Sequence, residues 1–150
     1  MALCACTGAA RSAPAPQPVG GDWRMAAEED SATLTWQAGA ARSLAFECHG
    51  GQDPNLGLMA WQPMTAAVPP TDKPEEIALT SGRERQTYPT LTQSNGGLWE
   101  QMGHARKNDP VITAFRRTGS LQMLERGNYA ATLASSPGNT AVADFFNWCH

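Results

Sequence analysis

Two Cys-His pairs stand far apart in this chain and could serve three kinds of chemistry. Cys48-His49 lies in the segment FECHG, and Cys149-His150 ends the sequence. Thiolate and imidazole groups hold zinc when three or four of them converge. A cysteine beside a histidine can also act as a nucleophile that a base activates. Alternatively, the two cysteines can form a disulfide in an oxidising compartment.

The segment around Cys48 predicts a strand that points this thiol inward. In SLAFECH, Leu44, Phe46 and Cys48 alternate with other side chains. Alternation with a period of two is typical of a half-buried strand, whose successive side chains point to opposite faces. His49 is therefore expected to project away from Cys48.

The last residues predict a helix that carries Cys149 on its buried face. Val142, Phe145, Phe146 and Cys149 have the spacing i, i+3, i+4 and i+7. This spacing marks one face of an α-helix. Because both cysteines lie on apolar faces, the pattern favours a disulfide between Cys48 and Cys149. Such a bond closes a loop of about a hundred residues and stabilises the fold by about 4–5 kcal/mol in the chain-entropy model.

Three alternatives to the disulfide stay open, and the simplest is that both thiols are buried and inert in a reducing compartment. A zinc site could combine Cys48, His49, Cys149 and His150 with His104, although adjacent residues ligate one metal poorly and no Cys-x-x-Cys spacing occurs. A cysteine nucleophile needs an electropositive cleft, and nothing in the sequence marks one around either thiol. Neither a Walker-type nor a dinucleotide-binding glycine pattern occurs. We therefore expect neither a metal nor a cofactor.

Composition narrows the class of protein. The chain has 150 residues with 41% hydrophobic and 17% charged side chains, enough for one domain with a core. The net charge is −3, and the nine arginines and two lysines are spread along the chain. Nucleic-acid binding normally needs a concentrated basic face, so we expect no nucleic-acid partner. No apolar run is long enough for a spanning helix, so contact with a membrane would need a lipid anchor.

Residues 1–21 differ in composition from the rest of the chain. They are rich in Ala, Pro and Gly, and the run APAPQP favours an extended linker. The run Leu3-Cys4-Ala5-Cys6 resembles the lipobox of bacterial lipoproteins, in which Cys6 would carry the lipid. A complete signal peptide has a basic start and an apolar stretch of about 7–15 residues, which this segment lacks. We therefore expect a disordered tether or signal remnant at 1–21 and a single β-rich domain at 22–150.

From Trp23 onward, short alternating segments are separated by turn residues. The pattern predicts about seven to nine short strands and two short helices, one in NDPVITAFRRTG and one at the C-terminus. Pro89 predicts an irregular edge strand, and Asn95-Gly96 predicts a type I′ hairpin turn. The expected class is mainly β (α+β), with an antiparallel β-sandwich or flattened barrel.

Five tryptophans are many for a chain of 150 residues. Trp36 shares a strand face with Leu34 and is expected in the core. Trp61, Trp99 and His104 form a candidate binding surface, because exposed aromatic side chains suit contact with a protein or carbohydrate partner. Core packing is the alternative for the two tryptophans.

Several segments carry a resemblance to a known group of proteins. They are GDWRM, LAFEC, ALTSGRERQTYP, NDPVITAFRRTGSLQM and the closing helix with its cysteine. The run from Leu44 to His150 resembles a group of uncharacterised envelope proteins from alphaproteobacteria. The ending VADFFNWCH departs from the more charged ending of that group. The resemblance implies export and a pairing of Cys48 with Cys149, and it implies no activity.

These observations together predict a non-enzymatic binding or structural domain of the periplasm or cell envelope, lipid-anchored at the outer membrane through Cys6. The first alternative is a periplasmic inhibitor or chaperone-like protein that docks a protein partner. The second is a hydrolase with an unrecognised site. An exposed patch containing Trp61 or Trp99 would favour the binding domain. A deep cleft containing His104 beside a carboxylate would favour the enzyme.

Overall fold

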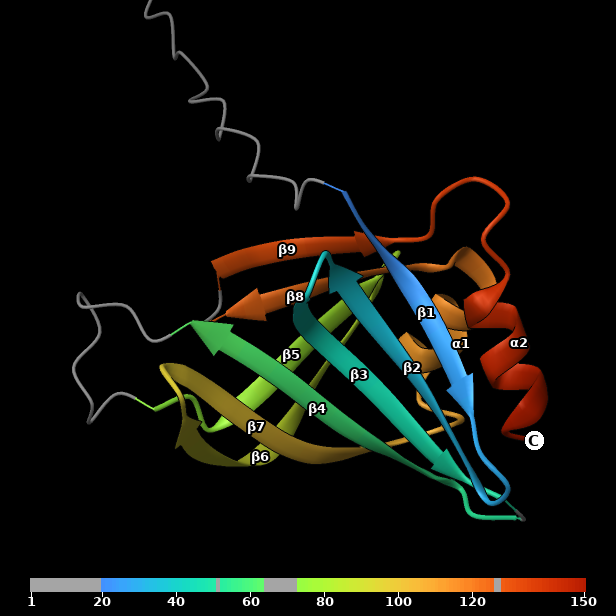
Figure 1. Ribbon diagram of the computed structural model, residues 1–150, viewed down its shortest axis with the longest axis horizontal. Helices are drawn as coiled ribbons and strands as arrows, with labels where there is room; N and C mark the ends of the chain where they lie inside the picture. The colour runs from blue at the N-terminus through green and yellow to red at the C-terminus, as the bar shows by residue number, and fades with distance from the viewer. Residues whose placement is uncertain (1–19, 51, 64–72, 126–127) are drawn as a thin grey trace, which may run out of the picture.

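A computed structural model describes residues 20–50, 52–63, 73–125 and 128–150. These described residues form nine strands and two helices, which confirms the expected mainly β class; Figure 1 shows their arrangement. In chain order they are β1 (Gly21–Ala27), β2 (Ser31–Ala38), β3 (Ala41–His49), β4 (Asn55–Pro63), β5 (Glu76–Ser81), β6 (Glu84–Asn95), β7 (Leu98–Arg106), α1 (Pro110–Thr118), β8 (Ser120–Glu125), β9 (Asn128–Ala134) and α2 (Ala141–Trp148). Cys6 and most of the expected tether lie outside the described residues.

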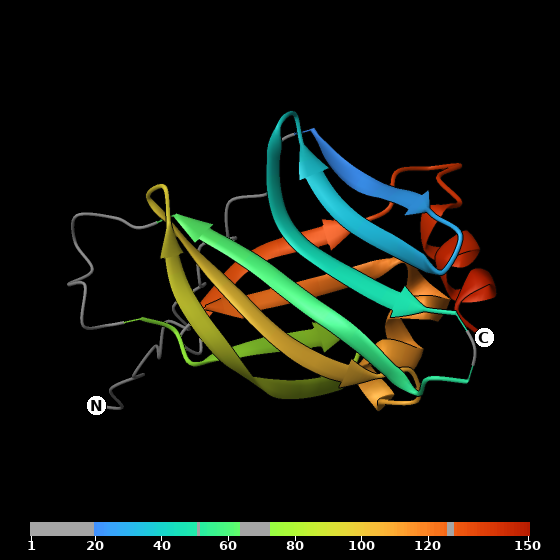
Figure 2. The same ribbon diagram turned by 60° about the horizontal axis from the view of Figure 1, so that its bottom comes forward.

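All strand pairs are antiparallel, and the sheet has the order β1-β2-β3-β4-β7-β6-β5-β8-β9. Strands twist, so a sheet of nine strands curls, and here it forms a nearly closed barrel (Figure 2). Both helices lie toward one end of this barrel. Of the two expected architectures, the flattened barrel is therefore the closer description.

The alternating segments bury the expected faces. Ala32, Leu34 and Trp36 on β2 are buried, as are Leu44, Phe46 and Cys48 on β3. The C-terminal helix α2 buries Val142, Phe145 and Phe146, in agreement with the predicted apolar stripe. Helix α1 ends at Gly119, whose φ of 66° is the left-handed conformation that glycine adopts readily.

Two local predictions need correction. Pro89 was expected on an edge strand, but β6 lies between β5 and β7. The Thr90 N–H donates to the Glu75 carbonyl, on the side of β5. Successive backbone N–H groups of a strand point to opposite sides, so the Pro89 nitrogen points away from β5. Its missing N–H therefore removes no hydrogen bond to that strand. The β6–β7 turn has Gly96 and Gly97 at its centre, with φ of 56° and 83°, rather than Asn-Gly. Both central residues of such a turn need positive φ, and the paired glycines supply it.

Side chains close the gap between the first and last strands. The Trp23 indole Nε1 donates to the Leu133 carbonyl on β9 at 3.2 Å. The Asp22 carboxylate accepts hydrogen bonds from the Ser136 backbone N–H at 3.1 Å and from the Ser136 hydroxyl. The Asn139 side-chain amide donates to the Trp23 carbonyl at 2.9 Å. The segment that follows β9 is thus fastened to β1 by polar groups.

The Asp22 fastening predicts a pH-dependent stability. Burial raises the pKa of Asp22, but hydrogen bonds from Ser136 and from the Trp23 backbone outweigh it and hold the pKa below 3.8. Asp22→Asn should lower the free energy of unfolding by about 1 kcal/mol at neutral pH, the usual worth of a hydrogen bond. Because the folded-state pKa is depressed, this difference should persist above pH 3.8 and vanish as the pH falls through the folded-state value.

Urea unfolding of the two proteins at several pH values measures this difference. Glu84→Gln, at an exposed position on β6, serves as the control and should leave stability unchanged at every pH. A constant difference between Asp22→Asn and the parent from neutral to strongly acidic pH would contradict the assignment.

Candidate functional site

Cys48 on β3 and Cys149 at the end of α2 are joined in a disulfide, as predicted. Their Cα atoms lie 5.9 Å apart, and the residues are 0% and 3% exposed. Because each sulfur is bonded to the other, neither thiolate is available for the zinc site or the nucleophile considered above. Across the described residues, no group of three or more His, Cys, Asp or Glu side chains could hold a metal.

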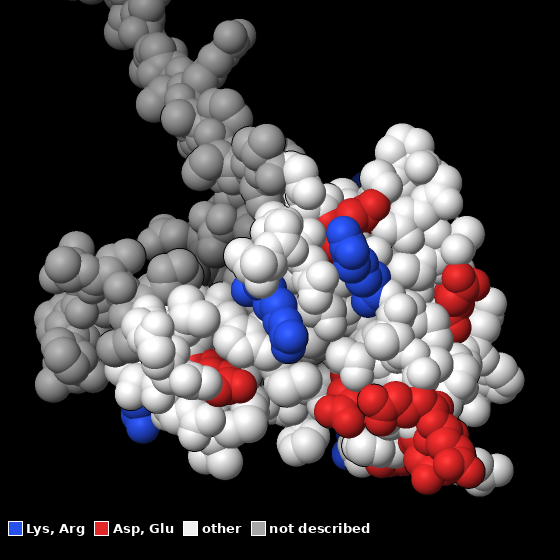
Figure 3. Space-filling view, in the orientation of Figure 1, with Lys and Arg blue, Asp and Glu red and all other residues white. Residues whose placement is uncertain are grey.

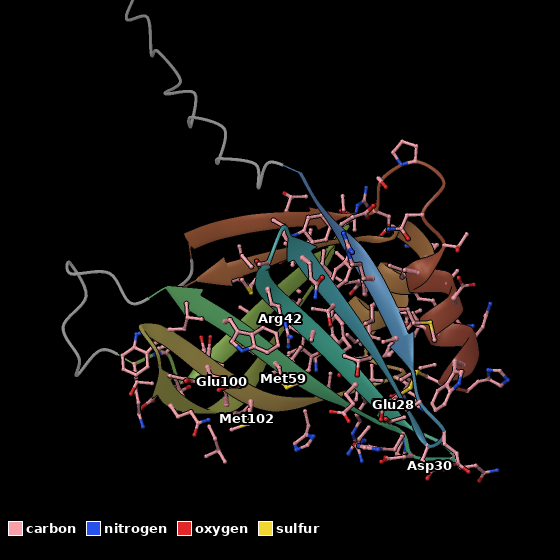
Figure 4. The ribbon with its side chains drawn as sticks, in the orientation of Figure 1. Glu28, Asp30, Arg42, Met59, Glu100 and Met102 are labelled. Atoms are coloured by element: carbon pink, nitrogen blue, oxygen red, sulfur yellow. A yellow bond between two sulfur atoms is a disulfide. The ribbon has the colours of Figure 1, made fainter. Side chains whose placement is uncertain are left out.

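The outer face of the barrel carries a row of apolar side chains that crosses four strands. Ala45 on β3 pairs with Met59 on β4, Met59 pairs with Met102 on β7, and Met102 pairs with Leu91 on β6. We call these four residues the methionine stripe. Leu91 is 78% exposed and Met102 is 40% exposed, whereas Ala45 is only 1% exposed. Met59 is half-buried, so the part of the stripe that is open to water lies on β4, β7 and β6. Figure 4 shows Met59 and Met102 close together on the surface of β4 and β7.

One side of the methionine stripe is aromatic and charged. Trp61 on β4 pairs with Glu100 on β7, two residues from Met59 and Met102 respectively. The Arg42 guanidinium on β3 lies 5.9 Å from the centre of the Trp61 ring, a cation–π arrangement. We call Arg42, Trp61 and Glu100 the aromatic flank; Figure 4 labels its two charged members.

The other side of the stripe is hollowed. Gly57 on β4 pairs with Glu47 on β3 and with His104 on β7. We call these three residues the glycine flank. Gly57 has no side chain, and it lines a surface hollow of about 520 Å³ together with Met59 and Met102. A Cβ at position 57 would lie 3.4 Å from the Glu47 Cβ, so any larger residue would begin to fill the hollow.

The glycine flank continues into a polar region at the β3–β4 turn. A second hollow of about 450 Å³ is lined there by Glu47, His49, Asp53, Asn55, Gly57 and His104. His49 Nε2 lies 3.6 Å from Glu47 Oε1. The Asn55 backbone N–H donates to Asp53 at 2.9 Å, and this bond is the main cause of a lowered pKa at Asp53. Acidic side chains gather at this end of the barrel (Figure 3), with Glu28 and Asp30 on the neighbouring β1–β2 turn.

The three residues predicted to form one binding surface do not all lie on the same face of the sheet. Trp61 is half-buried on the outer face, and His104 is exposed on the same face. Trp99 is only 8% exposed and faces the interior, so its assignment to a surface was wrong. It occupies the same strand face as the buried Gln101 and Ala105, at positions i, i+2 and i+6 of β7. His104 does lie near carboxylates, but on an exposed face rather than in a deep cleft.

The helices in the described part of the chain are too short or too polar to cross a membrane. Comparison of the sequence and structure with protein-family models, with curated proteins and with solved structures gave no match.

Proposed function

We propose that the chain is a non-enzymatic binding domain of the cell envelope and that its outer face docks a protein partner. The observation that carries this proposal is the exposure of Leu91, Leu98 and Met102, at 78%, 37% and 40%. These are the large apolar side chains most open to water in the described residues, and all three lie on β6 or β7. Contiguous exposed apolar surface marks interaction sites in soluble proteins.

The chemistry of the patch favours a protein over a carbohydrate. Sugar rings stack on open aromatic faces, whereas the Arg42 guanidinium lies over the Trp61 ring. Met59 and Met102 have flexible, polarisable side chains, which adapt to the varied apolar surfaces of protein partners. A third hollow, about 390 Å³, lies between Arg42, Trp61 and Leu98 and extends the patch to the β6–β7 turn.

Export to the periplasm or envelope is part of the same proposal. The disulfide between Cys48 and Cys149 supports it, because such bonds persist in oxidising compartments and are rare in the bacterial cytosol. A lipid on Cys6 would hold the domain at the outer membrane. We also propose that the chain is related to the alphaproteobacterial envelope group that its sequence resembles.

Site-specific photo-crosslinking in the cells that make the protein tests the docking face. The crosslinker p-benzoyl-phenylalanine is placed at Leu91 or at Met102, and at the exposed Thr113 on α1 as a matched control. We expect discrete protein adducts at positions 91 and 102 and none at 113. Met59→Asp should reduce the yield at position 91 several-fold, because a charge in the stripe must be desolvated on binding.

The crosslinking yields at positions 91 and 102 are compared with the yield at the control position 113. Absence of adducts at 91 and 102, or equal yields at 113, would overturn the proposal of a docking face. The mass of each adduct identifies the class of partner: twice the chain mass indicates a second copy, and any other mass indicates a different protein.

A further inference from the structure

We infer that a second copy of this chain docks on the methionine stripe, related to the first by a two-fold axis that runs along the stripe. This inference rests on the proposed docking function and names the partner. Closed dimers with two-fold symmetry are the commonest oligomers, and they use the same patch on both subunits. The patch must therefore be complementary to itself, and the two flanks of the stripe meet this requirement.

A two-fold axis along the stripe exchanges the flanks. It places the methionine stripe of one copy against the stripe of the other. It also places the aromatic flank of each copy over the glycine flank of its partner, because a rotation by half a turn about an in-plane axis reverses the two sides. The register across β3, β4 and β7 sets which residues then face each other.

The shapes of the flanks agree with this exchange. On β4, Trp61 and Gly57 stand at equal distances in sequence from Met59, two residues to either side. The axis therefore brings Trp61, the bulkiest residue of the patch, opposite Gly57 of the second copy. The hollow of about 520 Å³ beside Gly57 offers room for an indole ring. A tryptophan that fills a pocket at the centre of an interface is a typical hot spot.

The charged side chains of the two flanks are also complementary under this rotation. On β7, Glu100 and His104 lie two residues to either side of Met102, so Glu100 of one copy would face His104 of the other. On β3, Glu47 lies two residues from Ala45 on the outer face, and the contact of Arg42 with Trp61 places the guanidinium on the same face beyond the other side of the stripe. The Arg42 guanidinium would therefore face the Glu47 carboxylate of the other copy. No like charges face each other among these four, and each pair occurs twice in the dimer. Complementary charges of this kind set orientation and partner choice more than they set affinity.

The curvature of the barrel limits the strength of the association. A standard protein interface buries about 800 Å² on each partner. The outer face of the barrel is convex (Figure 2), which limits the area that two copies can bury against each other. We therefore expect a dimer that dissociates in the micromolar range, so its population depends on the local concentration of the chain.

Sedimentation equilibrium of the full chain, from about 1 µM to about 1 mM, tests the dimer. We expect a reversible monomer–dimer equilibrium. Arg42→Glu alone and Glu47→Arg alone should each weaken it by about 10-fold or more, since each places like charges opposite one another at two symmetric sites. The double variant R42E/E47R should restore it, because the exchanged charges again face opposite charges. Arg117→Glu, exposed on α1, is the matched control and should change nothing.

The restoration by the double variant is specific to the two-fold axis along the stripe. A chain that stays monomeric over the whole range overturns the inference. A dimer that R42E/E47R fails to restore overturns it too, because another face or axis must then be used. If the chain is monomeric but positions 91 and 102 still crosslink to a different protein, the inference of a second copy fails while the docking face stands.

Discussion

Replacing Cys48 and Cys149 together by alanine is expected to lower the free energy of unfolding by about 4–5 kcal/mol. The bond joins residues 101 positions apart, so its loss frees a long loop in the unfolded chain. It also releases the end of α2, where Cys149 is buried beside the last turn of the helix. Domains of this size are stable by about 5–15 kcal/mol, so the variant should approach the limit of folding.

Urea unfolding of the oxidised protein, the reduced protein and C48A/C149A measures this effect. Reduction should destabilise the parent by nearly as much as the double substitution does. The double variant itself should be insensitive to reductant, and this is the control for any effect of Cys4 and Cys6. A loss on reduction of under about 1 kcal/mol would show that the loop is held by other contacts, and that the chain-entropy argument does not apply to this fold.

Trp23→Ala should produce the second large effect, a loss of about 3–5 kcal/mol. Trp23 is 1% exposed, and its ring centre lies 4.9 Å from that of Phe115 and 5.5 Å from that of Trp36. Its indole N–H donates to the Leu133 carbonyl, across the seam between β1 and β9. Truncation therefore opens a cavity in the core and leaves a buried carbonyl without its donor, two separate causes of destabilisation.

Two matched variants separate these causes. Trp23→Phe keeps most of the ring packing but loses the hydrogen bond, so we expect a smaller loss of about 1–2 kcal/mol. Trp61→Ala, which removes a half-buried tryptophan from the outer face, should cost under about 1 kcal/mol because no core cavity forms. Thermal and urea unfolding measure all three variants. Equal losses for Trp23→Ala and Trp61→Ala would contradict the role of Trp23 in closing the barrel.

Local periodicity was sufficient to predict the inward faces of β2, β3 and α2 and the disulfide. The alternation around Cys48 and the helical spacing that ends at Cys149 each depend on a few neighbouring residues. A buried thiol on a strand and another on a terminal helix have few partners other than each other. The same reasoning predicted the strand that contains Leu34 and Trp36 and the helix that ends before Gly119.

The proposed docking face could not be predicted in this way, because it depends on register between distant strands. Met59 and Met102 are 43 residues apart, and nothing in either strand alone indicates that they are paired. Trp99 was misplaced because one tryptophan in a short strand does not show which face is buried. Pro89 was misplaced because a proline is tolerated inside a sheet where its strand changes partner, a circumstance that only the topology reveals.

The disulfide also makes a covalent ring of everything between residues 48 and 149. The ring contains strands β4 to β9, helix α1, α2 and three of the four residues of the methionine stripe. Eight of the eleven lysines and arginines lie inside it, so most sites for a trypsin-like protease do as well. A single cut at any of them leaves one molecule whose two pieces remain linked through sulfur. A domain in a protease-rich environment can thus be nicked once without shedding the strands that form its proposed docking face.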